Sequence, residues 1–273
     1  MKNHFFFGYF GNKRQEVEKI YSHFIKLKNI THIIEPFCGS AALSYFISIN
    51  EPKKYKYILN DNNNYLIELY KIARNNEELD NLIIRINCYV ERIRNITSIK
   101  EQKEEYMKII IIDNLETYII KNTIYSIRAG LYPSDAKRLK TMLGLNFYDK
   151  LKKCDIIKFL QNEDITFTNG CGIKCLETYK NDVNNFIFLD PPYLESCNTY
   201  YLNPDVNIYE YLYNNNINEY NSNILLCLND MWITRLLFKK NIKESYDKRY
   251  DSSNKKAKHI IIENEKQVGI ILK

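Results

Sequence analysis

The segment that most constrains the fold is a short apolar run, residues 186–189, followed directly by Asp190, Pro191, Pro192 and Tyr193. Consecutive apolar residues bounded by polar ones are typical of a parallel strand that is buried on both faces. Proline lacks a backbone N–H and fixes φ, so the strand must end where the prolines begin. We therefore expect a carboxylate, a free carbonyl and an aromatic ring at the carboxyl end of a strand, where open α/β sheets bind ligands.

The same alternation of strand and turn recurs along the chain. Strands are predicted at residues 31–35, 55–59, 165–168, 186–189 and 224–228. Helical periodicity follows most of them, which is typical of an α/β protein with a mostly parallel, Rossmann-like sheet. Residues 259–262 and 268–272 are predicted to form a closing hairpin that gives this sheet an antiparallel edge.

One internal segment departs from the pattern. From residue 76 to about residue 125 the sequence shows helical periods rich in charge and no strand signal, and a loop with basic residues follows. We predict that residues 76–154 form a mostly helical insertion. Residues 1–75 and 155–273 are then expected to make up one α/β domain.

Composition narrows the class of protein. The chain has 273 residues, of which 45% are apolar, so a full core is expected. Its net charge of +6 is compatible with a polyanionic partner but does not require one. The 7 cysteines lack the spacing of a metal site, so we expect no bound metal, and reduced cysteines suit an intracellular, reducing compartment. We expect neither a secretory signal nor a membrane-spanning segment.

A glycine turn follows the first predicted strand. In residues 35–42, Gly39 would let the backbone approach a ligand closely, and the helix beyond it offers free N–H groups. Nucleotides bind at this position in Rossmann-like sheets. The segment has a single glycine, so an ordinary turn between strand and helix is the alternative.

Asp61 ends the second predicted strand. An acidic residue about 20 positions after a glycine turn can accept both hydroxyls of a ribose. Asp and Asn are also preferred helix N-caps, so capping of the next helix is the alternative. Both roles could be shared between Asn60, Asp61 and Asn62.

The N-terminal loop carries Tyr9 and Lys13. Lys13 could pair with a carboxylate of a ligand, and Tyr9 could stack or hydrogen-bond beside it. Without further context, a solvated N-terminal segment explains the same residues.

Taken in chain order, these segments resemble the Dam-like, class α family of DNA adenine-N6 methyltransferases. The matching segments are Tyr-Phe-Gly-Asn-Lys (9–13), Ile-Glu-Pro-Phe-Cys-Gly (34–39), Leu-Asn-Asp-Asn (59–62) with Leu-Ile-Glu-Leu-Tyr (66–70), and Asp-Pro-Pro-Tyr (190–193). The resemblance covers the α/β part of the chain well and the insertion poorly. It departs from the family at Ser40, where many members carry a second glycine.

The resemblance implies an enzyme that methylates the exocyclic amine of a flipped-out adenine in double-stranded DNA, with S-adenosylmethionine as methyl donor. The insertion would be the target recognition domain. The implied catalytic residues are Asp190, Pro191, Pro192 and Tyr193. The implied cofactor-binding residues are Tyr9, Lys13, Glu35, Phe37, Gly39, Asp61, Phe167 and Asp190.

Basic residues are expected to supply the contacts with the duplex. The candidates are Arg128, Lys137, Arg138, Lys140, Lys255 and Lys256, with Lys248, Arg249 and Lys258 as further candidates near the C-terminus. Contacts with phosphates position a duplex without reading its sequence, whereas Arg128 or Arg138 could read guanine edges. For any single one of them, a solvated surface cation is the alternative.

Three other functions compete with DNA adenine methylation. The Asp-Pro-Pro-Tyr motif alone leaves adenine, cytosine and glutamine amines open as targets. Glutamine methyltransferases usually carry Asn before Pro-Pro-Tyr, so Asp190 disfavours them. Methylation of adenine in RNA and a non-catalytic, nucleic-acid-binding relative stay open as alternatives.

Overall fold

The computed structural model describes residues 5–7, 9, 13–51, 53–126, 145–147, 151–193, 208–249 and 256–265. The chain divides into two compact units. The α/β unit consists of Asn12–Ile67 and Glu163–Lys273, and the helical unit consists of Met1–Gly11 and Glu68–Asn162.

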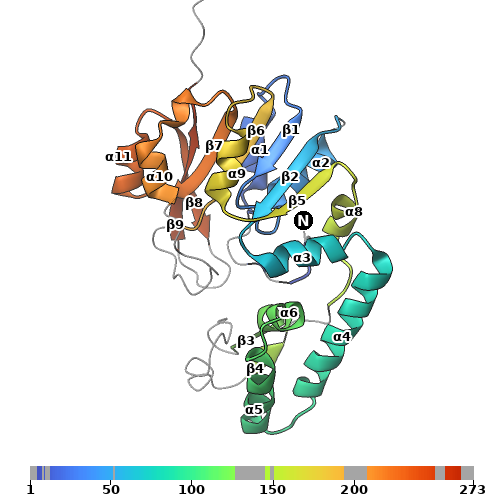
Figure 1. Cartoon of the computed structure of the whole chain (residues 1–273). Helices are drawn as coiled ribbons and strands as arrows, with labels where there is room; N and C mark the ends of the chain where they lie inside the picture. Colours follow the sequence, from blue (N-terminus) through green and yellow to red (C-terminus); the bar gives the residue numbers. More distant parts are fainter. Residues whose placement is uncertain are drawn as a thin grey trace, which may run out of the picture. The chain divides into compact units, whose positions relative to one another are not determined.

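A seven-stranded sheet forms the centre of the α/β unit, with the order β5-β2-β1-β6-β7-β9-β8 (Figure 1). The strands are β1 (His32–Glu35), β2 (Lys56–Asp61), β5 (Ile165–Asn169), β6 (Asn185–Leu189), β7 (Asn223–Asn229), β8 (Ile242–Arg249) and β9 (Lys256–Glu263). The pairs from β5 to β7 are parallel, whereas β9 is antiparallel to both of its neighbours. The predicted Rossmann-like α/β fold is thus confirmed.

The sheet ends in an antiparallel edge, as predicted, and β9 contains the predicted residues 259–262. It pairs with β7 on one side and with β8 on the other, and β8 is a strand that the sequence pattern had not indicated. The predicted partner strand was residues 268–272. Those residues lie outside the described part of the chain. The strand β8 lies at the edge of the sheet and is rich in charged side chains, so its sequence resembles that of an exposed loop.

Helices cover both faces of the sheet (Figure 1). The helices of this unit are α1 (Val17–Phe24), α2 (Ala42–Asn50), α9 (Gly172–Tyr179), α10 (Ile208–Asn214) and α11 (Trp232–Phe238), with a short 3-10 helix at Ile217–Glu219. On one face Phe24 of α1 packs edge-on against Phe186 of β6, with ring centroids 4.9 Å apart. On the other face Ile187 of β6 shares a cluster with Leu176 of α9 and Leu212 of α10. Burying each such side chain stabilises the fold by about 1.5–3 kcal/mol.

The helical unit contains α4 (Asn76–Arg94), α5 (Ile99–Ile110), α6 (Leu115–Thr123) and α8 (Ile156–Leu160). Its helices α4, α5 and α6 begin at Asn75, Ser98 and Asn114, whose side chains accept backbone N–H bonds of the first turn. Two short strands, β3 (Ile124–Ser126) and β4 (Leu145–Phe147), pair antiparallel, which the sequence pattern had not indicated.

The helix α3 (Asn64–Ile72) contributes residues to both units. The helical unit thus includes residues on either side of 76–154, and the role of that segment as a recognition domain stays a prediction. Within the described ranges, no helix combines the length and apolar character that crossing a membrane requires.

Candidate active site

The strand order places a topological switch point between β1 and β6. From β1 the chain continues to β2 and later to β5 on one side, while β6 and β7 extend the sheet on the other side. Ligands of open α/β sheets bind outside the carboxyl ends of the strands at such a point. The glycine turn follows β1 here, and Asp190 follows β6.

The turn after β1 has a backbone that suits a close approach. Gly39 has a φ of 46° and Ala41 a φ of 48°, both in the left-handed region. Glycine adopts this conformation without the steric cost that a Cβ atom brings. The Cys38 N–H donates to the Asn60 carbonyl (2.8 Å), which ties the turn to the end of β2.

Asp61 holds the glycine turn through backbone amides. Its Oδ2 accepts the Gly39 N–H (2.9 Å), and its Oδ1 accepts the Asn63 N–H (3.0 Å). Burial raises the pKa of Asp61, while these hydrogen bonds oppose that rise. Asn63, whose Oδ1 accepts the Leu66 N–H (3.2 Å), caps α3, so the alternative capping role of Asp61 belongs to Asn63.

Asn60 is a structural residue of the site that the sequence interpretation left without a definite role. Its buried side chain donates to the carbonyls of Pro36 (2.8 Å) and Gly170 (2.9 Å) and accepts the hydroxyl of Thr168 (2.9 Å). It therefore joins the ends of β1, β2 and β5. An asparagine directly after the apolar run of β2 was the available signal in the sequence.

Two aromatic rings lie on this side of the switch point. Phe37, in the turn after β1, is half-buried and packs over Gly172 at the start of α9. A Cβ atom on Gly172 would come within 2.4 Å of the Phe37 ring. Phe167, on β5, is half-buried, and its Cα pairs with that of Leu59 on β2.

Glu35 ends β1 with a buried carboxyl group. It accepts the backbone N–H of Ser44 (2.9 Å) and also the Ser44 hydroxyl. Burial raises the pKa of Glu35 to about 7, although the Ser44 hydrogen bonds oppose the shift and nearby Asp190 adds to it. Glu35 therefore connects β1 to α2 beneath the glycine turn.

Asp190 takes part in an ion pair and a hydrogen bond on one oxygen. The Lys13 ammonium lies 2.6 Å from its Oδ1, and the Tyr193 hydroxyl donates to the same atom (3.1 Å). Lys13 also donates to the Tyr193 hydroxyl (2.6 Å). Both of these contacts with Asp190, from Lys13 and from Tyr193, are made to Oδ1 and not to Oδ2. Pro191 is buried beside this group, and Pro192 and Tyr193 are half-buried.

The charge of Lys13 is secured by its neighbours. Its side chain is only 4% exposed, and burial alone would lower the pKa of Lys13. The attraction of Asp190 and of Glu16 outweighs burial and raises this pKa above its ordinary value. Lys13 therefore keeps its positive charge beside Asp190 despite its burial.

A second buried group lies beside this pair and was missed from the sequence. Glu16 Oε1 accepts the Tyr246 hydroxyl (2.7 Å) and lies 2.8 Å from His259 Nδ1, and Oε2 pairs with Lys248. The His259 ring meets the Tyr193 ring edge-on, with centroids 5.2 Å apart. We call Glu16, Tyr246, Lys248 and His259 the Glu16 cluster.

This cluster corrects one predicted DNA contact. Lys248 is buried and paired with Glu16, so it is not available to a duplex, and the prediction for this residue is wrong. Its position on an edge strand, alternating with exposed residues, explains the error. Lys258 is exposed.

The other predicted DNA contacts lie outside the described residues or side chains. These residues are Arg128, Lys137, Arg138, Lys140, Arg249, Lys255 and Lys256.

Tyr9, a predicted cofactor-binding residue, belongs to the helical unit, where its ring packs edge-on against Phe5, with the ring centroids 5.5 Å apart. Among the described residues, no group of His, Cys, Asp and Glu is arranged to hold a metal ion.

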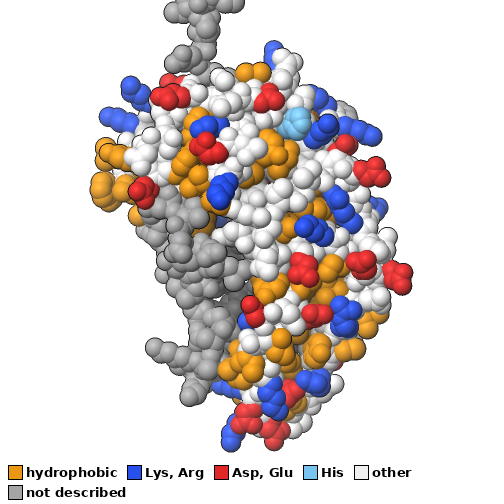
Figure 2. Space-filling view, viewed as in Figure 1, with side chains coloured by type: hydrophobic (Ala, Val, Ile, Leu, Met, Phe, Trp, Pro, Cys, Tyr) orange, Lys and Arg blue, Asp and Glu red, His pale blue; other side chains and the backbone are white. Residues whose placement is uncertain are grey.

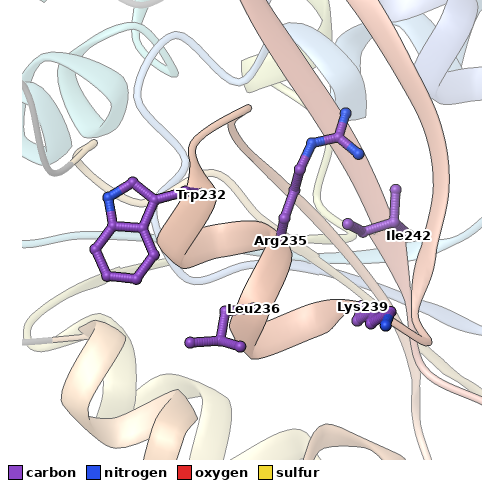
Figure 3. A pocket seen from close by; sticks show the side chains of 5 residues that line it. All are labelled: Trp232, Arg235, Leu236, Lys239 and Ile242. Atoms are coloured by element: carbon purple, nitrogen blue, oxygen red, sulfur yellow. The ribbon is translucent and has the colours of Figure 1, made fainter.

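A separate pocket of the α/β unit lies at α11. Its lining consists of Trp232, Arg235, Leu236, Lys239 and Ile242 (Figure 3). Hydrophobic side chains gather over this helix at the edge of the molecule (Figure 2), and Trp232 is 75% exposed. Arg235 is paired with Asp230. The residues around Asp190 do not line this pocket, so it is not part of the candidate site.

Comparison with known families identifies the chain. No curated protein matches it. The sequence matches the D12 class N6 adenine-specific DNA methyltransferase family over residues 9–211, well over half of the chain. The match includes Lys13, the glycine turn, Asp61 and the residues from Asp190 to Tyr193. The protein therefore belongs to the D12 class N6 adenine-specific DNA methyltransferases and is an enzyme that methylates adenine in DNA.

Proposed function

We propose that this enzyme takes its methyl group from S-adenosylmethionine and transfers it to an adenine flipped out of double-stranded DNA, with Asp190 and the Pro191 carbonyl receiving the target amine. The observation that carries the proposal is the carboxylate of Asp190 at the switch point. It is fixed through Oδ1 by Lys13 and Tyr193, so Oδ2 is the oxygen assigned to the amine.

The residues around the glycine turn fit an adenosine-containing cofactor. Gly39 permits close approach of the backbone, the Asp61 carboxylate can accept ribose hydroxyls, and Phe37 offers a flat ring. Phe167 is assigned to the cofactor's adenine, and Glu35 supports the turn from below. When bound, S-adenosylmethionine supplies an electrophilic methyl group. Lys13 and Tyr9 are assigned to its methionine end.

The target amine needs help because its lone pair is delocalised into the adenine ring. Asp190 Oδ2 and the Pro191 carbonyl would each accept one N–H, which favours a pyramidal nitrogen with an available lone pair. As the amine forms its new bond, positive charge grows on nitrogen, and the Asp190 carboxylate stabilises it. This arrangement requires no prior deprotonation. Pro192 keeps the turn extended, and the Tyr193 ring is assigned to the flipped adenine.

The DNA contacts are assigned to basic residues. Phosphate binding is proposed for Arg128, Lys137, Arg138, Lys140, Lys255 and Lys256, and recognition of the DNA sequence for the insertion at 76–154. The net charge of +6 supports a polyanionic partner. RNA is the competing substrate and forms one arm of the test.

The test measures methyl transfer from labelled S-adenosylmethionine to duplex DNA, single-stranded DNA and RNA in parallel. We expect label in duplex DNA, recovered as N6-methyladenine after digestion to nucleosides. Asp190→Ala should abolish incorporation while the variant stays folded at the assay temperature, although the loss of the partner of Lys13 lowers its unfolding temperature. The control, Asp247→Asn, removes an exposed carboxylate of the same unit and should retain activity. Label appearing mainly in RNA, or near-normal incorporation by Asp190→Ala, would overturn the proposal.

A further inference from the structure

Glu16 occupies the N-cap of α1, yet its side chain does not cap that helix. No side-chain capping bond forms there, and the carboxylate instead contacts Tyr246, Lys248 and His259 on β8 and β9. A free helix N-terminus would normally attract such a carboxylate. The chain thus gives up a local stabilising bond for three contacts with distant strands.

One route from Glu16 leads to Lys13. The Glu16 N–H donates to the Lys13 carbonyl (2.8 Å), which closes a tight turn before α1. Because Glu16 is anchored to β8 and β9, this turn is anchored as well. The Lys13 side chain extends from it to Asp190 and Tyr193, and Lys13 itself is attracted by the charge of Glu16.

A second route leads to Tyr193. Glu16 fixes the His259 ring through Nδ1, and the His259 ring packs edge-on against the Tyr193 ring. Asp190 Oδ1 is contacted by the ammonium of Lys13 and the hydroxyl of Tyr193. The carboxylate of Glu16 therefore holds both of these residues, although its own side-chain bonds are made to β8 and β9.

We propose that Glu16 is a positioning residue for methyl transfer, which orients the Asp190 carboxylate by fixing Lys13 on one side and, through His259, Tyr193 on the other. The inference rests on the proposed role of Asp190. It assigns to Glu16 an effect on the rate of transfer that is larger than any effect on the binding of either substrate.

The charge of the cluster supports this role. Lys13 and Lys248 are buried cations, and they pair with the half-buried carboxylate of Asp190 and the buried carboxylate of Glu16. Burial opposes the ionised form of Glu16, but the hydrogen bond from His259 and the two lysines hold the pKa of Glu16 well below its usual range. Glu16 therefore stays anionic at any pH used for assay.

The experiment compares Glu16→Gln with Glu18→Gln in the full-length protein. Glu18 lies in the first turn of the same helix and is exposed, so its variant makes the same change of charge without touching the cluster. For Glu16→Gln we expect kcat to fall about 100-fold, the penalty typical of a small misplacement of reacting groups. We expect KM for DNA to change less than twofold, and the calorimetric affinity for S-adenosylmethionine, whose methionine end is assigned to Lys13, to fall less than tenfold. Glu18→Gln should match the wild type.

A double variant separates positioning from simple loss of stability. Glu16→Gln leaves Lys248 buried without its partner, which lowers the unfolding temperature. Adding Lys248→Met removes that charge, so the unfolding temperature should recover while kcat stays low. Recovery of kcat along with stability, or a loss that appears only in substrate affinity, would overturn the inference. An inactive wild type would instead contradict the proposed function itself.

Discussion

Two carboxylates lie on either side of β1, and they are held by different means. Asp61, at the end of β2, is fixed by the backbone amides of Gly39 and Asn63. Asp190, after β6, is fixed by the side chains of Lys13 and Tyr193. Backbone amides orient a group without adding a mobile charge, whereas an ammonium ion supplies a full charge at a chosen atom.

The difference matches the two tasks that we assign. A ribose is neutral, so a carboxylate with oriented lone pairs is sufficient to bind its hydroxyls. A developing positive charge on nitrogen needs a carboxylate whose position is fixed before the reaction begins. We therefore propose that the Asp61 side of the switch point serves binding of the cofactor, while the Asp190 side serves the chemical step.

Replacing each carboxylate by its amide tests this division of tasks, and the larger effect is expected for Asp190. Asp190→Asn removes the charge that we propose stabilises the reacting nitrogen and should lower kcat about 1,000-fold, the upper range for loss of one electrostatic contact in an active site. Steady-state and single-turnover methyl transfer to duplex DNA would measure it. If the single-turnover rate falls less than tenfold, Asp190 does not differ from Asp61 in its contribution to the chemical step.

Glu35, on β1 between the two, is a buried carboxyl group that accepts hydrogen bonds from Ser44, and its raised pKa should make the stability of the fold depend on pH. The folded protein binds its proton more tightly than the unfolded chain, because its pKa rises from 4.5 to about 7 on folding. This contribution is complete below pH 4.5 and disappears as the pH rises to about 7. It amounts to about 3 kcal/mol.

Urea unfolding from pH 4.5 to 8 would measure this dependence. The difference between wild type and Glu35→Gln should change by that amount over the interval. Glu18→Gln, which removes an exposed carboxyl group, should run parallel to the wild type. An equal slope for Glu35→Gln and wild type would contradict the assignment.

On the Asp61 side, the contact of Phe37 with Gly172 should tolerate no added methyl group. Gly172→Ala places a Cβ atom within 2.4 Å of the ring and should destabilise the fold by about 2 kcal/mol in urea unfolding. The matched variant, Gly170→Ala, meets only the Asn60 side chain at 3.9 Å and should cost less. Equal losses in the two variants would show that the contact does not hold the turn.

The smallest expected effect is that of Asp61→Asn. An amide can keep only one of the two backbone bonds, so the glycine turn loosens and one ribose acceptor is lost. We expect KM for S-adenosylmethionine to rise about tenfold, equivalent to about 1.4 kcal/mol, with kcat changed less than twofold. Asp247→Asn is the control. If kcat of Asp61→Asn fell as much as that of Asp190→Asn, Asp61 would not be limited to cofactor binding, and the proposed division of tasks would be wrong.

Local signals in the sequence were sufficient to predict the parallel strands and the Asp61 side of the site. The strands β1, β2, β5, β6 and β7 were predicted because each combines an apolar run with a turn. The glycine turn and Asp61 were found because they lie about 20 residues apart on adjacent strand ends. Their physical link, the bond from the Gly39 N–H to Asp61, spans only 22 positions.

The partners of Asp190 and the Glu16 cluster depend on contacts between distant segments, which no local pattern predicts. Glu16, Tyr246 and His259 are unremarkable residue types in their own segments, and they meet only because β9 inserts between β7 and β8. The same insertion buries Lys248, which resembles a surface cation in the sequence. Asp190 was recognised from its prolines, but its partners could not be derived without the strand order.

The long separations within the Glu16 cluster bear on how the enzyme is made. Glu16 and His259 are 243 positions apart, whereas Lys13 and Tyr193 are 180 apart. Contacts of this range close late in folding, because the loop entropy must be overcome first. A ribosome that has released residue 193 has already supplied the whole switch point, yet β8 and β9 are still to be translated. Full methylation activity should therefore arise only after β8 and β9 have been added, so an incompletely synthesised chain should mark DNA far more slowly than the finished enzyme.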